Sequence, residues 1–337
     1  MLIKYIFNRI LYTIPLVFGI TLISFFILQL APGNYFTQLK LNPQISEDTI
    51  AQMEREFGLD KPWYFQYFYW MREILVPVVK HAGVIPYVTP KLNFGHSFTY
   101  HVPITTLIKE RLFNTFILSL SAMLFTWFIA VPIGIYSAVH QYSWADKIFS
   151  VLAFFGMSVP NFFLAFLLLY IASVTGWFPI GGMVSGNYDT LSLLGKIWDR
   201  FHHLLIPTFV LGTSGMAGLV RLMRANMLDD LRSEYVTTAR AKGLSERVVI
   251  YKHALRNAIN PFITLFGYQL SGLFSGAALT EIIVSWPGLG QLMLEAVRSQ
   301  DLYLVMGSLL MGAFMLIAGN LLADILLAVS DPRIRHE

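Results

Sequence analysis

Six apolar runs, each of about twenty residues or more, restrict the fold of this 337-residue chain more than any other feature. A helix of that length crosses the hydrocarbon core of a bilayer, and within lipid only a helix satisfies the backbone hydrogen bonds of a single segment. The runs cover residues 10–30, 112–139, 148–177, 203–223, 262–285 and 302–329. The sequence therefore predicts an all-α, polytopic membrane protein with six transmembrane helices.

The first apolar run has the length of a membrane span rather than that of a secretory signal. Lys4 and Arg9 precede it, as basic residues precede a signal, but the apolar part of a signal has only about 7–15 residues. Residues 31–34 also lack the small-residue pattern of a cleavage site. We therefore interpret residues 1–31 as an uncleaved first transmembrane helix. Hydrophobic residues make up 55% of the chain and charged residues 13%, which excludes an ordinary soluble domain.

Basic residues predict which side of the membrane each segment faces. Lysine and arginine gather in short cytoplasmic loops, whereas long loops cross regardless of charge. Six spans put both termini on one side, and the basic residues that fall on that side are Lys4, Arg9, Lys147, those of the 221–256 loop, Arg333 and Arg335. We expect a multi-pass protein of the cell inner (plasma) membrane with both termini cytoplasmic. The net charge of +4 then needs no nucleic-acid partner.

Residues 32–110 would form an extracytoplasmic segment with interfacial helices. Ser46 is positioned to cap a helix that ends at Gly58. A second helix begins with residues 63–70, which are almost all aromatic, as is typical of a segment at the lipid headgroup level; an aromatic ligand cleft is the alternative. The 77–90 stretch is rich in proline and resembles an inserted loop, to which the sequence assigns no role.

The longest polar stretch between two apolar runs, residues 233–261, predicts two helices joined by a hinge. Ser233 is a suitable N-cap for a helix that ends near Lys242, and Gly243 stands where a left-handed residue would close it. Ser245 would cap a second helix that ends before the final proline.

The second helix of this stretch is amphipathic. Spacings of three and four place its apolar residues on one stripe, namely Val248, Tyr251, Leu255 and Ile259. The other face is basic, with Arg247, Lys252 and Arg256. Such a helix could lie on anionic lipid, or the pair could form a rigid helix–turn–helix for a cytoplasmic partner, and the residue pattern leaves both open.

Two parts of this stretch resemble the cytoplasmic loop of ABC importer permeases: residues 235–243, Tyr-Val-Thr-Thr-Ala-Arg-Ala-Lys-Gly, and residues 253–258, His-Ala-Leu-Arg-Asn-Ala. The general pattern is Glu-Ala-Ala, three residues, Gly, nine residues, Ile-x-Leu-Pro, which Ala239, Gly243 and Leu255 match. The departures from it, at Thr237, Thr238, His253 and Arg256, resemble the first permease subunit of dipeptide and oligopeptide importers. Further stretches similar to that family are 57–62, 94–97, 280–290 and 331–335.

The resemblance implies the type I ABC importer permease fold, with a five-helix core over residues 111–329, a cytoplasmic coupling loop over 224–260 and a tail over 330–337. It also implies a homologous second permease, two ABC ATPase subunits and an extracytoplasmic peptide-binding protein as partners. ATP and Mg would be bound by the ATPases and no cofactor by this chain. The residues expected to couple to the ATPases are Glu234, Tyr235, Thr238, Ala239, Arg240, Ala241, Lys242, Gly243, Leu244, His253, Leu255, Arg256 and Asn257. Peptides are the expected cargo, although similar proteins carry glutathione, nickel or haem.

No sequence motif predicts catalysis in this chain. The only Gly-Lys pair, at 195–196, lacks the flanking residues of an ATP-binding loop. The HExxH pattern of zinc proteases and the GxSxG pattern of hydrolases are both absent from the sequence. We expect a non-catalytic membrane subunit rather than a membrane-embedded enzyme.

A self-sufficient secondary carrier or channel is the alternative function. Such a carrier usually keeps a charge inside the membrane, and the candidates are Asp324 and Glu281, both of which we expect to reach the membrane interface. Asn161 and Gln269 are proposed to line a translocation path, with hydrogen bonding between helices as the alternative role.

Overall fold

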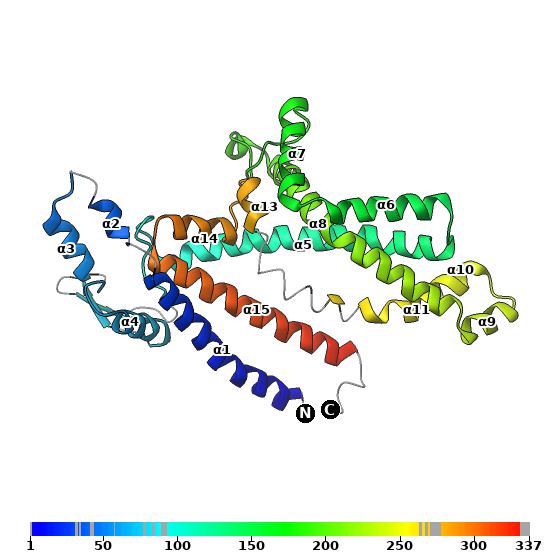
Figure 1. The fold of residues 1–337 in the computed structure, drawn as a ribbon, viewed down its shortest axis with the longest axis horizontal. Helices are drawn as coiled ribbons and strands as arrows, with labels where there is room; N and C mark the ends of the chain where they lie inside the picture. The colour runs from blue at the N-terminus through cyan, green and yellow to red at the C-terminus, as the bar shows by residue number, and fades with distance from the viewer. Residues whose placement is uncertain are drawn as a thin grey trace. The chain divides into compact units, whose positions relative to one another are not determined.

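The computed structural model describes residues 2–30, 33, 35–40, 44–56, 58–76, 79–82, 85–88, 93–262, 265–266, 269 and 278–330, and it describes their side chains except at 2–10, 38, 56, 79–82, 85–88 and 322–330. The described regular secondary structure is all helical except for one two-stranded antiparallel sheet (Figure 1). Its contacts form two compact units, Met1–Phe113 with Gly288–Ala318 and Asn114–Pro287 with Gly319–Glu337. Helices α5 (Ile104–Val139) and α15 (Leu302–Ser330) each contribute to both units.

The first unit combines the N-terminal part of the chain with a later helical pair. Besides parts of α5 and α15, its helices are α1 (Leu2–Leu30), α2 (Tyr35–Leu39), α3 (Glu47–Glu56), α4 (Trp63–Leu75) and α14 (Leu289–Arg298). The 77–90 stretch, expected to be a loop, contains the antiparallel strands β1 (Val79–Ala82) and β2 (Ile85–Val88), with Val79 opposite Val88. The predicted cap of α3 is confirmed, because the Thr49 N–H donates to Ser46 Oγ at 3.2 Å.

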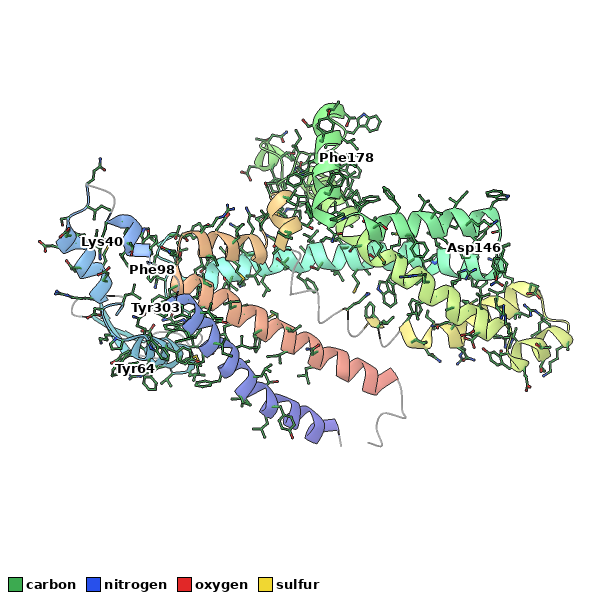
Figure 2. All side chains as sticks on the ribbon, viewed as in Figure 1. Lys40, Tyr64, Phe98, Asp146, Phe178 and Tyr303 are labelled. Carbon is green, nitrogen blue, oxygen red and sulfur yellow. The ribbon has the colours of Figure 1, made fainter. Side chains whose placement is uncertain are left out.

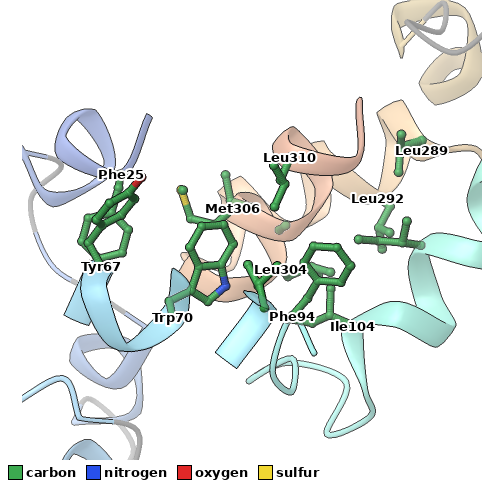
Figure 3. Packing of buried hydrophobic residues seen from close by; sticks show 14 residues of the cluster. Phe25, Tyr67, Trp70, Phe94, Ile104, Leu289, Leu292, Leu304, Met306 and Leu310 are labelled. Carbon is green, nitrogen blue, oxygen red and sulfur yellow. The ribbon is translucent and has the colours of Figure 1, made fainter. Parts of the chain in front are cut away.

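An apolar core packs α1, α4, α14 and α15 together (Figure 3). Phe25 of α1 meets Tyr67 of α4 edge to face with ring centroids 5.4 Å apart, and Trp70 is buried one turn further along α4. Tyr64 and Phe68 on the opposite side of α4 are exposed. Helix α4 therefore has one buried face and one exposed aromatic face, which is the pattern expected of an interfacial helix.

The second unit contains the helices on which the polar stretch is built. Besides most of α5, its elements are α6 (Trp144–Ser158), α7 (Asn161–Thr175), η1 (a 3₁₀ turn, Tyr188–Thr190), α8 (Leu193–Leu231), α9 (Glu234–Ala241), α10 (Glu246–Val248), η2 (a π-helix, Val249–Ala254), α11 (Leu255–Ala258) and α13 (Ala278–Ile283). Serine caps start the two longer helices that follow turns: Ser143 accepts the Asp146 N–H at 3.1 Å, and Ser192 accepts the Gly195 N–H at 3.2 Å. Helix α6 packs along α8.

Four helices of the described chain, α1, α5, α8 and α15, are long and apolar enough to cross a membrane. Helices α6 and α7 pass the same test only as a pair, and they are bent by 101°. The 148–177 run is therefore not one straight helix, and its role as the third span stays a prediction. The cause of the bend is Pro160, which drives Val159 out of the helical region to φ −89°, ψ 122°.

The six-span count and the predicted domain boundaries stay predictions. Half of the 262–285 run and the whole 331–337 tail lie outside the described residues, as do the side chains of Lys4, Arg9 and Asp324. Helix α5 starts at Ile104, so the proposed boundary between residues 110 and 111 falls inside a helix.

Candidate functional site

The 233–261 stretch folds as two short helices joined by a tight turn. Helix α9 ends in two hydrogen bonds, from the Gly243 N–H to the Arg240 carbonyl at 2.9 Å and from the Leu244 N–H to the Ala239 carbonyl at 3.4 Å. These bonds define a Schellman motif, and Gly243 at φ +75° is its left-handed residue. Ser233 and Ser245 hold the N-cap positions of α9 and α10, although neither side chain makes a capping bond. The predicted two helices, with a left-handed Gly243 closing the first, are therefore confirmed, and the role of the turn as a hinge stays a prediction.

The two helices pack their apolar faces on α5 and α8. Val236 and Ala239 of α9 lie in one cluster with Val249, Ala254 and Ala258 of the second helix, all at most 4% exposed. The same cluster includes the α5 and α8 residues Ala130, Ile135, Ala138, Leu219, Val220, Met223 and Met227. The apolar face of the pair is thus occupied by protein and is not available to a lipid surface.

The predicted apolar stripe of the second helix is only partly correct. Val248 and Tyr251 are exposed, whereas Val249, Ala254 and Ala258 form the buried face. The π-helix η2 explains the difference, because it separates stacked residues by five positions instead of three or four. Single-turn π segments occur often at functional sites.

Most residues predicted to couple to the ATPases lie on the outer face of this pair. The ten exposed ones are Glu234, Tyr235, Thr238, Arg240, Ala241, Lys242, Gly243, Leu244, Arg256 and Asn257. His253 and Leu255 are half-buried, and Ala239 is buried in the apolar cluster. Ala239 therefore packs within the chain, while the ten exposed residues lie on the hairpin's outer side, which we call the coupling face.

Side-chain contacts brace this hairpin. Arg240 donates from Nε to Glu246 Oε1 at 2.8 Å and so joins α9 to α10. The hydroxyl of Tyr235 donates to Asp230 Oδ1 at the end of α8. Burial, followed by that hydrogen bond to a carboxylate, raises the pKa of Tyr235, so the hydroxyl keeps its proton and its donor role at physiological pH.

Asn226 of α8 attaches the second helix directly. Its Nδ2 donates to the carbonyl of Ala258 at 3.2 Å, near the C-terminal end of α11, where helical carbonyls have no intrahelical partner. The hairpin is therefore joined to α8 by covalent continuity at α9 and by a hydrogen bond at α11.

The two residues proposed for a translocation path occupy different environments. Asn161 starts α7 at the bend after Pro160 and is half-buried. Gln269 accepts a hydrogen bond at Oε1 from Nε1 of Trp127 on α5. Gln269 thus makes a hydrogen bond to another segment, which is the alternative to lining a translocation path.

Glu281 does not reach an interface as the sequence suggested. It is 0% exposed, and Thr115 of α5 donates from Oγ1 to its Oε1 at 2.8 Å. Asn114 donates to the Pro287 carbonyl at 2.9 Å, and Trp286 returns a bond from Nε1 to the Asn114 carbonyl at 3.1 Å. Glu281 thus belongs to a polar network that joins α5, at Asn114 and Thr115, to α13 and the segment after it.

Sequence reasoning also missed the ion pair between Asp146 of α6 and Arg224 of α8 (Asp146 is labelled in Figure 2). A local signal was present, because Ser143 followed three residues later by an acidic residue is a capping-box pattern. The arginine partner is 78 positions away in the chain, so no local pattern could have identified it.

Comparisons with known proteins give consistent matches over the whole chain. The family model described as binding-protein-dependent transport system inner membrane component matches residues 130–336, and the N-terminal model for membrane components of such systems matches residues 1–121. The oligopeptide transport system permease protein AppB of Bacillus subtilis (strain 168) is 39% identical over 98% of this chain and 99% of its own length. The dipeptide transport system permease protein DppB of Escherichia coli (strain K12) is 35% identical over 100% of both chains. Among solved structures, the MetNI methionine ABC transporter in inward-facing conformations matches with a TM-score of 0.48 and 14% identity over 66% of this chain and 97% of that one.

Proposed function

The chain belongs to the family of binding-protein-dependent transport system inner membrane components, and on that basis we propose that it is the first permease subunit of an ATP-driven importer of dipeptides or oligopeptides. Relatives named as oligopeptide and dipeptide permeases are 39% and 35% identical over almost the whole chain, which supports the peptide cargo. The subunit itself would be non-catalytic and multi-pass in the inner membrane, with both termini cytoplasmic.

The observation that carries the coupling role is the two-sided hairpin of α9 to α11. One side is fixed to α5 and α8 by the apolar cluster and by the bond from Asn226 to Ala258. The other side is the coupling face, with Lys242 and Arg256 exposed on it. A rigid element with this division can receive force on its exposed side and pass it to the spans on its buried side.

The partners follow from this assignment. Two ABC ATPases, which bind ATP and Mg, would press on the coupling face, and a homologous second permease would complete the translocation path. An extracytoplasmic peptide-binding protein would deliver cargo to the outer segments. Asn161 at the α6–α7 bend stays a candidate for lining the path, and Gln269 is a weaker one because its Oε1 accepts a bond from Trp127.

The test is to tag this chain, extract it from its native membrane in mild detergent and identify the proteins that co-purify in stoichiometric amounts. We expect a homologous permease, ATPases with nucleotide-binding loops, and a binding protein whose eluted ligand is a peptide. Recovery of the chain alone or as a homo-oligomer, under conditions that keep known complexes intact, would contradict the proposal.

Among the described side chains, the burial of Glu281 favours a secondary carrier, because such carriers need an enclosed ionisable group. The two functions differ in their requirements. A carrier must transport when purified alone and must lose transport on Glu281→Gln, whereas an importer subunit must be inactive without its ATPases. Reconstitution of the purified chain in vesicles with a proton gradient separates the two.

A further inference from the structure

The ion pair between Asp146 and Arg224 has a two-point geometry. Arg224 donates from Nε to Asp146 Oδ1 at 3.2 Å and from Nη2 to Oδ2 at 3.1 Å. The Asp146 side chain is 6% exposed and that of Arg224 is 27% exposed. Such a bidentate, largely buried contact fixes both the distance and the orientation of the two groups, unlike a mobile pair on the surface.

Asp146 also organises the turn between α5 and α6. Its Oδ2 accepts the N–H of Tyr142 at 2.9 Å, and its own N–H is capped by Ser143. Tyr142 has φ +64°, a left-handed conformation that a tyrosine adopts only when its surroundings hold it there. The carboxylate thus joins a strained turn to the guanidinium of α8.

Helix α8 contacts the turn and the hairpin at neighbouring positions on opposite sides. Arg224 binds Asp146, and Asn226, two residues later, binds the Ala258 carbonyl. Two residues correspond to about 200° of helical rotation, because an α-helix has 3.6 residues per turn. Residues 224–226 of α8 are therefore bonded on one side to the α5–α6 turn and on the other side to the hairpin.

Close packing makes this junction stiff. A Cβ added to Gly134 of α5 would lie 2.6 Å from the Cβ of Met223, so the two helices approach more closely there than any other residue type allows. Met223 immediately precedes Arg224 on α8 and is fully buried. A displacement of α8 at this level cannot be absorbed by loose packing against α5.

We infer that Asp146 and Arg224 are positioning residues that make the α5–α6 turn move together with α8 when the ATPases displace the hairpin. This inference rests on the proposed coupling role. The inference adds α6 to the elements that move with the hairpin and α8. The displacement then also reaches the bend at Pro160, where α6 meets α7. Without the pair, the hairpin and α8 would still bind the ATPases and α6 would still pack along α8, but the α5–α6 turn would lose its fixed contact with α8, so less of the displacement would reach α6.

The test uses the complete transporter in proteoliposomes with its binding protein, supplied with a tryptic digest of casein. ATP hydrolysis and the peptides taken up, quantified by mass spectrometry, give the ATP consumed per peptide. The central variant is the double substitution Asp146→Asn with Arg224→Met. It leaves no unpaired buried charge, and the amide oxygen of the asparagine can still accept the Tyr142 N–H.

We expect this double variant to accumulate and to co-purify with the ATPases as the parent does, while ATP consumed per peptide rises roughly 3- to 30-fold. An unchanged ratio would overturn the inference. If the double variant does not accumulate, the ATP consumed per peptide is measured for Arg224→Lys instead. This variant keeps the positive charge but cannot make the bidentate contact. An unchanged ratio in Arg224→Lys would likewise overturn the inference, and a raised one would support it.

A parallel variant, Gly243→Val, distinguishes failure of this inference from failure of the proposed function. If Gly243→Val raises the ATP consumed per peptide and the Asp146 and Arg224 variants do not, the hairpin couples but the pair does not position α6. If none of these variants changes the ratio, the coupling assignment of the hairpin itself fails.

Discussion

Replacement of Gly243 isolates the contribution of the hairpin's turn. Gly243 is the left-handed residue of the Schellman motif that ends α9, and a Cβ built on it meets no described atom within 4 Å. A substitution there changes the backbone energy without creating a clash. Any effect on transport then reports the geometry of the turn rather than the loss of a packing contact.

The expected cost follows from the backbone alone. The left-handed conformation costs an L-residue about 1–2 kcal/mol, and a β-branched residue lies at or above the upper end of that range. About 2 kcal/mol shifts a conformational equilibrium roughly 30-fold away from the native turn. Asparagine adopts this conformation at a much smaller cost, so Gly243→Asn is the matched control for Gly243→Val.

The assay is ATP hydrolysis stimulated by the loaded binding protein, measured beside peptide uptake in proteoliposomes. We expect Gly243→Val to insert and assemble normally while peptide uptake per ATP falls roughly 30-fold, and Gly243→Asn to change it by about twofold at most. Normal uptake by Gly243→Val would refute the coupling assignment. An equal loss in both variants would refute the backbone argument, because it would mean that the partner contacts the bare glycine surface.

Three further predictions concern residues outside the hairpin. Glu281→Gln should retain peptide uptake within about twofold, because the amide oxygen still accepts a hydrogen bond from the Thr115 hydroxyl. Loss of uptake at normal protein levels would favour the secondary-carrier function. Asp301→Ala should lower the free energy of unfolding by about 2–4 kcal/mol, because it leaves the buried Ser97 hydroxyl and the Thr99 N–H without their acceptor. Asp301→Asn is the control, and thermal unfolding of the complex measures the effect of both substitutions. Gly134→Ala should lower the midpoint of thermal unfolding, because its Cβ meets Met223. Gly218→Ala in α8 should raise that midpoint slightly, because a Cβ there meets no described atom within 4 Å and alanine favours the helix. Equal effects of the two substitutions would contradict the packing argument.

Features that depend on a few adjacent residues could be predicted from the sequence. Ser46 caps α3 as expected, and Gly243 closes α9 in the left-handed conformation. Both work because capping is decided by hydrogen bonds within one helical turn. The long apolar helices α5, α8 and α15 follow equally directly, since length and hydropathy are local properties.

Features that depend on distant partners could not be predicted in the same way. Glu281 is buried and accepts a hydrogen bond from Thr115, 166 positions away, and Asp146 is paired with an arginine on another helix. Because of the π-helix η2, the second helix buries Val249 instead of the expected Val248, and no residue pattern predicts such a change in the helical repeat. These misses lie at the contacts between elements, where tertiary packing overrides the local pattern.

An element that transmits force must be fixed more firmly to what it moves than to what moves it. The hairpin meets this condition, because its buried face contributes Val236, Ala254 and Ala258 to a core shared with α5 and α8, while its outer face is solvent-exposed. Under the proposed coupling role, binding of ATPases to the outer face can therefore be reversible in every cycle without loosening the inner contacts. The difference also separates two kinds of variant: substitutions on the inner face should reduce the amount of folded subunit, and those on the coupling face should reduce work per ATP at an unchanged amount.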